Sequence, residues 1–199
     1  MTELPRRTPQ QARGERRVSE LLDATAHVIA AVGYDAATMS AIADRAGAPI
    51  GSLYQFFPNK PSIVQALRTQ YVQKFEEMWL PLEVEAAAMD LPNLVRRLIE
   101  STIRFADENP AFPALLDAPS STRTPAAIRK IIKERLAACL RACLPRLPQR
   151  KALELATVTL QMLKAMNQLY AEVPLPEKRG VVQEFKIAVL SYLNVRTNK

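Results

Sequence analysis

Residues 38–60 read TMSAIADRAGAPIGSLYQFFPNK, which are two short segments separated by a glycine-containing break. Apolar residues in the first segment recur at helical spacing, so Met39 and Ile42 lie on one side of a predicted helix. Thr38 stands where an N-cap is expected, and Gly47 suits the left-handed residue that ends such a helix. The first segment is therefore predicted to pack against a core.

Residues 49–57 have the opposite character. Leu53 and Phe57 lie on one side of a predicted helix and can anchor it to the first. Its other side carries small or polar residues, namely Gly51, Ser52, Tyr54 and Gln55. Such a helix can enter the major groove of DNA. The pair predicts a helix-turn-helix, and an ordinary helical hairpin at the edge of a core is the alternative.

The side chains of the second segment suit base contacts. Gln55 can pair with adenine, Ser52 with a base or a phosphate, and Ile50 with a thymine methyl group. Gly51 lowers helix propensity by about 1 kcal/mol relative to alanine. That cost makes sense if another backbone approaches closely at this position.

Residues 21–67 resemble the DNA-binding domain of the TetR family of bacterial transcriptional regulators. The matching positions are Gly33-Tyr34, Thr38, Ile42-Ala43, Ala46-Gly47, Gly51, Leu53-Tyr54, Phe57 and Lys60. Pro49 departs from the family pattern, which often has Ser or Thr there. Proline loses a hydroxyl cap but is suited to a first helical turn.

The resemblance implies roles for individual residues. Thr38, Tyr54 and Lys60 match positions that hold DNA phosphates, whereas Ile50, Ser52 and Gln55 match positions that face the bases. Only base contacts would decide the operator sequence. The remaining predicted DNA contacts are Ser40, Pro49, Gly51, Arg16 and Arg17. Two alternatives stay open: a merely solvated Lys60, and a Tyr54 half-buried against Pro58.

The charge of the chain agrees with an anionic partner. It has 27 basic and 20 acidic residues, a net charge of +7 and a pI near 9.6. A local cluster near the N-terminus consists of Arg6, Arg7, Arg13, Arg16 and Arg17. This arm is expected either to lie along DNA or to form a solvated tail. Arg16 and Arg17 are the better placed, because they belong to the first predicted helix.

Fifteen prolines divide the chain. Proline inside a helix costs about 3 kcal/mol, so the stretches between proline clusters predict helices. These are residues 11–32, 60–81, 91–109, 124–144, 148–172 and 177–195. No segment alternates with a period of two, so the chain is predicted to be all-α. The N-terminal arm and the three-helix DNA-binding domain are expected over residues 1–58, and a helical effector-binding and dimerisation domain over residues 59–199.

The last two predicted helices have more apolar surface than one contact requires. Burial within one subunit would explain this excess. The resemblance implies instead a homodimer interface formed by Leu155, Val158, Met162, Leu169, Val182, Phe185, Val189 and Tyr192. A two-fold dimer would place two recognition helices on successive turns of a palindrome.

A set of large or adaptable residues, with a few polar ones, is a candidate effector pocket. Its members are Phe75, Met78, Trp79, Arg104, Phe105, Phe112, Met162, Met166, Asn167 and Tyr170. The residues alone fit a filled core equally well. The resemblance implies a pocket, because family members commonly have one in this domain.

Several classes of protein are not expected. No apolar run approaches the roughly 18 residues of a membrane span, and no secretory signal is recognised, so we expect a cytoplasmic protein. Cys139, Cys143 and the single histidine, His27, do not form a metal-ligand set. The cysteines are interpreted as apolar fillers and His27 as a surface residue. No metal, cofactor or catalytic motif is predicted, so we expect no enzyme.

These observations together predict a DNA-binding transcriptional regulator. The favoured form is a homodimeric repressor that a small-molecule effector releases from a palindromic operator. The alternative is a helical ligand-binding or protein-interaction dimer with a vestigial helix-turn-helix.

Overall fold

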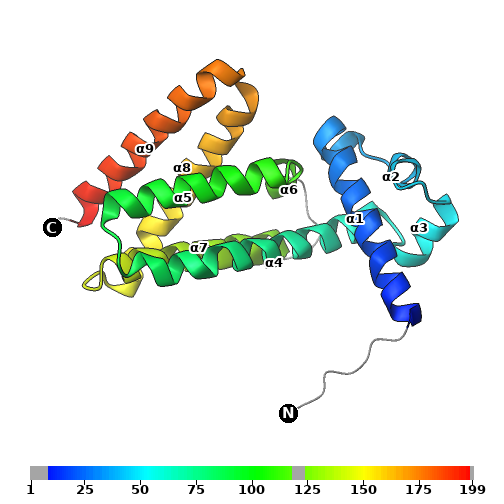
Figure 1. Ribbon diagram of the computed structural model, residues 1–199, viewed down its shortest axis with the longest axis horizontal. Coiled ribbons are helices and arrows are strands. Elements are labelled where there is room, and N and C mark those ends of the chain that lie inside the picture. The colour runs from blue at the N-terminus through cyan, green and yellow to red at the C-terminus, as the bar shows by residue number, and fades with distance from the viewer. Residues whose placement is uncertain (1–8, 118–123, 198–199) are drawn as a thin grey trace, which may run out of the picture. The chain divides into compact units, whose positions relative to one another are not determined.

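The computed structural model describes residues 9–117 and 124–197, and every regular element in them is a helix (Figure 1). The helices are α1 (Pro9–Ala36), α2 (Met39–Arg45), α3 (Ile50–Phe56), α4 (Lys60–Ala86), α5 (Leu91–Glu108), α6 (Phe112–Asp117), α7 (Thr124–Cys143), α8 (Gln149–Glu172) and α9 (Leu175–Thr197). The prediction of an all-α chain is confirmed. Within these described ranges, no helix combines the length and the apolar character that crossing a bilayer requires.

The described residues form two compact units. The first contains α1, α2, α3, the start of α4 up to Gln70, and α6. The second contains α4 from Tyr71 onward, together with α5, α7, α8 and α9. Because α4 is one continuous helix that contributes to both units, it is a direct covalent link between them.

The core of the first unit includes apolar side chains from α1, α2, α3 and the start of α4. Its fully buried residues include Leu21 and Ile29 of α1, Ile42 of α2, Leu53 of α3 and Ile63 of α4. In this unit α1 packs against α2 and α6, and α2 packs against α3. The core therefore holds α3 from one side only.

Gly33 interrupts the helical geometry of α1. Its φ of 79° and ψ of 169° lie outside the helical region, although the assigned helix continues to Ala36. Glycine is suited to this conformation because it lacks the Cβ that disfavours positive φ in other residues. The predicted end of the first helix at residue 32 agrees with this break.

The predicted end of α4 at Pro81 is wrong, since the helix continues through this proline to Ala86. A proline inside a helix removes one backbone hydrogen bond and crowds the preceding turn. The residues after it compensate, because Leu82 and Ala86 are both buried. Tertiary packing thus outweighs the local preference to end the helix.

The proline-rich stretch after α5 contains a short helix, α6, that was not predicted. Leu115 of α6 is buried, and its backbone oxygen accepts hydrogen bonds from Nε (3.3 Å) and Nη2 (3.1 Å) of Arg68 on α4. Burial lowers the pKa of Arg68 from its ordinary value. An arginine held in this way ties α6 to the first part of α4.

The second unit is a bundle in which α8 contacts α7, α9 and α5, and α5 also contacts α7 and α9. Its fully buried side chains include Leu94, Leu98, Leu136, Leu140 and Leu155. Asp90 caps α5 by accepting a hydrogen bond from the backbone N–H of Asn93 at 2.9 Å. Arg135 of α7 joins α4 through ion pairs with Glu76 (3.6 Å) and Glu83 (3.2 Å).

Candidate DNA-binding and ligand-binding sites

The two helices of the predicted helix-turn-helix begin and end as their sequence indicates. Thr38 Oγ1 accepts a hydrogen bond from the backbone N–H of Ala41 at 3.1 Å, which confirms the N-cap of α2. Gly47 has a φ of 58° and follows the end of that helix. Leu53 is fully buried and Phe57 is nearly so, which confirms both anchors of α3.

The opposite side of α3 is open. The exposed fractions of Ile50 and Tyr54 are 41% and 50%, Gly51 and Gln55 are also exposed, and Ser52 is half-buried. A Cβ added at Gly51 would meet no atom of the described residues within 4 Å apart from its chain neighbours and the adjacent backbone of α3. The close approach expected at Gly51 therefore does not come from the described residues of the protein itself.

Lys60, the first residue of α4, is held by the end of α1. Its Nζ donates hydrogen bonds to the backbone oxygens of Tyr34 (3.0 Å) and Asp35 (3.1 Å). The same nitrogen lies 4.7 Å from the centroid of the Tyr34 ring. Lys60 is thus more than a solvated lysine. It fixes the start of α4 to the end of α1, and its phosphate contact stays a prediction.

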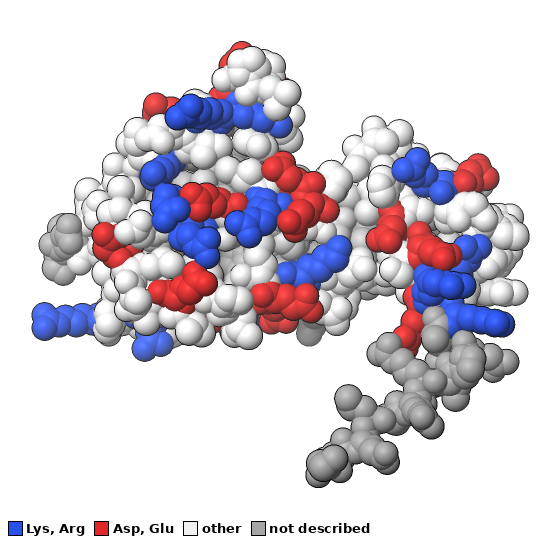
Figure 2. Space-filling model, in the orientation of Figure 1, with Lys and Arg blue, Asp and Glu red and all other residues white. Residues whose placement is uncertain are grey.

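Basic side chains gather beside the described start of α1 (Figure 2). Arg16 and Arg17 share the carboxylate of Glu20, at 3.7 Å and 2.8 Å. Exposed ion pairs of this kind contribute at most about 1 kcal/mol, so a DNA phosphate could compete for either arginine. Arg6 and Arg7 lie outside the described residues.

The other predicted DNA contacts border α2 and α3. Ser40 is exposed in the first turn of α2. Pro49 is exposed and is the N-cap residue of α3, where it supplies no side-chain hydrogen bond. As the sequence predicts, α3 therefore begins without a side-chain cap.

An aromatic cluster lies inside the second unit. The rings of Phe75 and Trp79 stack at a centroid distance of 4.7 Å, and Phe105 meets Phe75 edge-on at 5.7 Å. Tyr71 meets Phe105 edge-on at 6.3 Å. All four residues are buried, so they form a continuous aromatic layer between α4 and α5.

The remaining residues of the candidate effector pocket are distributed unevenly. Met166 is fully buried, whereas Met78, Met162, Asn167 and Tyr170 are half-buried. Arg104 is exposed, and Phe112 belongs to the first unit. The second unit therefore contains every residue of the predicted set except Phe112.

Three buried polar atoms in the second unit have no hydrogen-bond partner among the described residues. They are Trp79 Nε1, Thr159 Oγ1 and Asn167 Oδ1. Trp79 and Thr159 have exposed fractions of 1% and 0%. Buried polar groups are usually hydrogen-bonded, since leaving one unsatisfied costs about 1 to 3 kcal/mol.

Two residues near this region were missed in the sequence. Tyr71 is one turn of helix before Phe75, so the same spacing that connects Phe75 to Trp79 could have identified it. Thr159 is the one hydroxyl-bearing residue among the buried residues of α8. A polar residue at a position of the apolar face is the signal that could have identified it.

The helix α8 has two apolar faces. Its buried face includes Leu155, Thr159, Leu163 and Met166. A second stripe consists of Val158, Met162, Ala165 and Leu169, in which Val158 and Leu169 are 43% and 40% exposed. This second stripe has no full cover within the described chain.

The helix α9 repeats this division between buried and accessible side chains. Among the predicted interface residues, Val182, Phe185 and Tyr192 are half-buried. Val189 of α9, like Leu155 of α8, is already buried inside the subunit. These two residues therefore belong to the core beneath the predicted interface rather than to its accessible surface.

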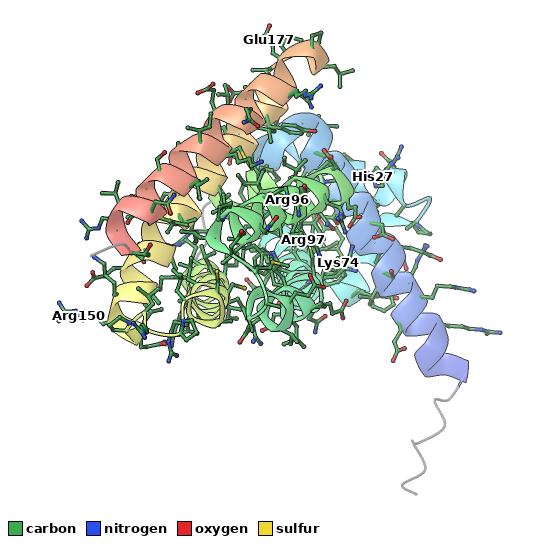
Figure 3. The ribbon with its side chains drawn as sticks, turned by 60° about the vertical axis from the view of Figure 1, so that its left-hand side comes forward. His27, Lys74, Arg96, Arg97, Arg150 and Glu177 are labelled. Carbon is green, nitrogen blue, oxygen red and sulfur yellow. The ribbon has the colours of Figure 1, made fainter. Side chains whose placement is uncertain are left out.

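The cysteines and the histidine have unremarkable surroundings. Burial raises the pKa of Cys139 to about 12. Cys143 Sγ donates a hydrogen bond to the backbone oxygen of Met89 at 3.2 Å. His27 is exposed on α1 (Figure 3). Its Nδ1 lies 2.8 Å from the backbone oxygen of Asp23. The surface position predicted for His27 is confirmed.

Two short helices in which the second has a buried anchor and an open outer face form the arrangement of a helix-turn-helix. Residues 21–67 match the family model described as bacterial regulatory proteins, tetR family. Residues 90–193 match the model described as tetracyclin repressor-like, C-terminal domain. The chain belongs to the TetR family.

Curated relatives are similar over part of their length. The chain is 42% identical over 62 residues to the HTH-type transcriptional repressor KstR of Mycobacterium tuberculosis, covering 31% of this chain and 28% of the relative. It is 32% identical over 113 residues to KstR of Rhodococcus jostii, covering 50% of this chain and 53% of the relative. The chain thus spans about half, or less, of the length of these relatives.

Solved structures show the same fold. A TetR-family transcriptional regulator from Streptomyces coelicolor has a TM-score of 0.66 at 24% identity, over 89% of this chain and 98% of that chain. The fatty acid degradation regulator FadR from Bacillus halodurans has a TM-score of 0.68 at 17% identity, over 94% and 97%.

The contacts of Lys60 predict a role in stability that is independent of DNA. Lys60→Met should lower the free energy of unfolding by about 1 to 3 kcal/mol, because two charge-assisted hydrogen bonds and a cation–π contact are lost. Thermal unfolding without DNA measures this effect. Arg45→Met, at an exposed position of α2, is the control. Equal melting temperatures for the two variants would contradict the prediction.

Proposed function

We propose that this protein is a homodimeric repressor that acts in the cytoplasm, binds a palindromic operator and is released by a small-molecule effector. The observation that carries the proposal is the division of α3 into a buried anchor and an open face. Leu53 is fully buried, whereas Tyr54 and Gln55 beside it are exposed. The names of the partial relatives, both transcriptional repressors, support negative regulation.

The open face of α3 suits the major groove. Ile50, Ser52 and Gln55 are proposed to face the bases. Gly51 between them leaves room for close approach, since no described residue beyond its neighbours in α3 lies against it. Thr38, Tyr54 and Lys60 are proposed to hold phosphates. This arrangement separates the residues that give sequence preference from those that fix the register.

The unpaired stripe of α8 supports a homodimer. Val158, Met162, Ala165 and Leu169 recur at alternating spacings of four and three, the pattern of a helix that packs against another helix. A second copy would cover them by two-fold symmetry, together with the accessible part of α9. The two copies would then present two recognition helices to two half-sites.

The aromatic layer and the unpartnered polar atoms of the second unit support an effector site there. Phe75, Trp79 and Phe105 offer apolar surface, while Thr159 and Asn167 offer polar atoms that a ligand could satisfy. The proposed effector is thus a largely apolar molecule with at least one hydrogen-bonding group. Its binding would be coupled to DNA release through α4, with a typical coupling of about 1 to 3 kcal/mol.

Selection of bound duplexes from a random pool tests the proposal. The wild-type protein is expected to recover a palindrome, and Gln55→Ala the same palindrome with relaxed preference at one position of each half-site. Arg16→Ala is the control for phosphate contacts, since it should weaken all sequences alike and reduce the salt slope by about one. Recovery of no common sequence by the wild-type protein would overturn DNA-directed function. Equal losses on operator and scrambled DNA for Gln55→Ala would remove its base-reading role.

The exposed stripe of α8 predicts the oligomeric state. Val158→Glu or Leu169→Glu should weaken the dimer at least about tenfold, because a carboxylate would be buried without a partner. Sedimentation velocity across a dilution series measures this change. Thr157→Glu introduces the same charge on the polar side of α8 and should leave the dimer intact. A wild-type protein that is monomeric at every concentration would refute the dimer.

The unpartnered hydroxyl of Thr159 predicts an unusual gain in stability. Thr159→Val should raise the free energy of unfolding of the ligand-free protein by about 1 kcal/mol, because it replaces an unsatisfied hydroxyl with a methyl group of similar shape. Chemical denaturation measures the change, with Thr157→Val as a control at an exposed position of the same helix. A clear loss of stability would show that the hydroxyl of Thr159 already has a partner in the free protein.

A further inference from the structure

A pocket of about 860 Å³ lies in the second unit, between the turn that joins α7 to α8 and the C-terminal end of α9. Its lining consists of residues 143–148, Lys151 and residues 195–197. None of these residues belongs to the aromatic layer or to the predicted effector pocket. The volume is within the range of small-molecule sites.

One part of the lining is apolar. Leu144, Leu147 and Val195 contribute it, and Val195 is 68% exposed. The turn itself is ordered by a hydrogen bond from the backbone N–H of Leu147 to the backbone oxygen of Leu144 at 2.9 Å. Pro145 and Pro148 restrict the backbone further. The apolar surface is therefore preformed.

The charged part of the lining is entirely basic. Arg146, Lys151 and Arg196 line the pocket, and no aspartate or glutamate does. Lys151 shares Glu154 with Arg150, at 3.9 Å and 3.3 Å. Among the described residues, no ion pair involves Arg146 or Arg196. Two cations thus border the pocket without an acidic partner among the described side chains.

Two further features affect the charge of the pocket: the neutral thiol of Cys143 and the N-terminus of α8. Burial, and secondarily Asp90, raise the pKa of the Cys143 thiol, so this residue stays neutral near pH 7. Pro148 caps α8 without a side-chain hydrogen bond, and α8 has 24 residues. The first backbone N–H groups of a long helix carry partial positive charge. These N–H groups add to the field of the three side chains.

We propose that this pocket binds a small organic anion with an apolar or aromatic body. The guanidinium groups of Arg146 and Arg196 and the ammonium group of Lys151 would hold the acidic group, and the body would lie against Leu144, Leu147 and Val195. A lining that combines cations with apolar surface favours this ligand class over both inorganic anions and neutral apolar compounds. The site is additional to the proposed effector site and does not depend on it.

The test compares naphthalene-2-sulfonate with its neutral analogue naphthalene-2-sulfonamide and with inorganic sulfate, using the full chain. Amide chemical shifts locate binding, and calorimetry measures affinity. The sulfonate should bind one equivalent per chain and shift the amides of residues 143–151 and 195–197. The sulfonamide and sulfate should each bind at least about tenfold more weakly.

Variants at the pocket sharpen the test. Arg146→Gln and Arg196→Gln should each weaken sulfonate binding about 3- to 10-fold, the range expected for a partly exposed charge-assisted contact. Arg150→Gln is the matched control, because Arg150 is an exposed cation in the first turn of α8, does not line the pocket and points outward in Figure 3. All three positions are exposed, so the variants are expected to fold.

Several results would overturn the proposal. These are an absence of sulfonate binding up to millimolar concentration, an equal affinity for the sulfonamide or for sulfate, and shifts confined to other parts of the chain. An equal loss for Arg150→Gln would do the same, because it would show a general effect of surface charge.

Discussion

The burial of Leu53 is the constraint on which the proposed DNA-binding surface depends. The helix α3 has only seven residues, which is too short to be stable in water on its own. Leu53, with no exposed surface, and Phe57 hold it against the core of the first unit. Any change that loosens this anchor would disorder the open face of α3, even though no residue of that face is altered.

The same reasoning explains why α8 has more apolar surface than a single subunit uses. One face, with Leu155 and Leu163, is covered by the second unit. The stripe of Val158, Met162 and Leu169 is left partly open. Exposed apolar surface is costly when it is contiguous, so a helix that keeps such a stripe is typical of an interface. The anchor in α3 thus accounts for the proposed DNA-binding face, and the stripe in α8 accounts for the proposed two-fold dimer.

Local signals predicted most of the fold. The cap at Thr38, the break at Gly47 and the anchors Leu53 and Phe57 depend on neighbouring residues, and the structure confirms them. Pro81 misled the prediction because the burial of later residues, which the local pattern cannot reveal, stabilises the helix beyond it. The helix α6 was missed because the burial of Leu115 and its contact with Arg68 cannot be read from the local pattern either.

Long-range contacts account for the rest of what the sequence concealed. Lys60 meets the end of α1 from 25 or 26 positions away, and Arg68 meets Leu115 from 47 positions away. Neither partner is recognisable from spacing, since each accepting group is a backbone oxygen that every residue carries. The same limit applied to Thr159, whose lack of a partner appears only when the surrounding helices are in place.

These long-range contacts also bear on how a signal would reach the DNA-binding face. Lys60 and Arg68 both belong to α4. Lys60 donates hydrogen bonds to the backbone oxygens of Tyr34 and Asp35, and Arg68 donates two to the backbone oxygen of Leu115. The loss predicted for the Lys60 contacts alone, about 1 to 3 kcal/mol, is already comparable to a typical allosteric coupling. Breaking the Arg68 contacts would add to this cost. In the proposed mechanism, a displacement of α4 would therefore carry α1 and α6 with it rather than break these contacts.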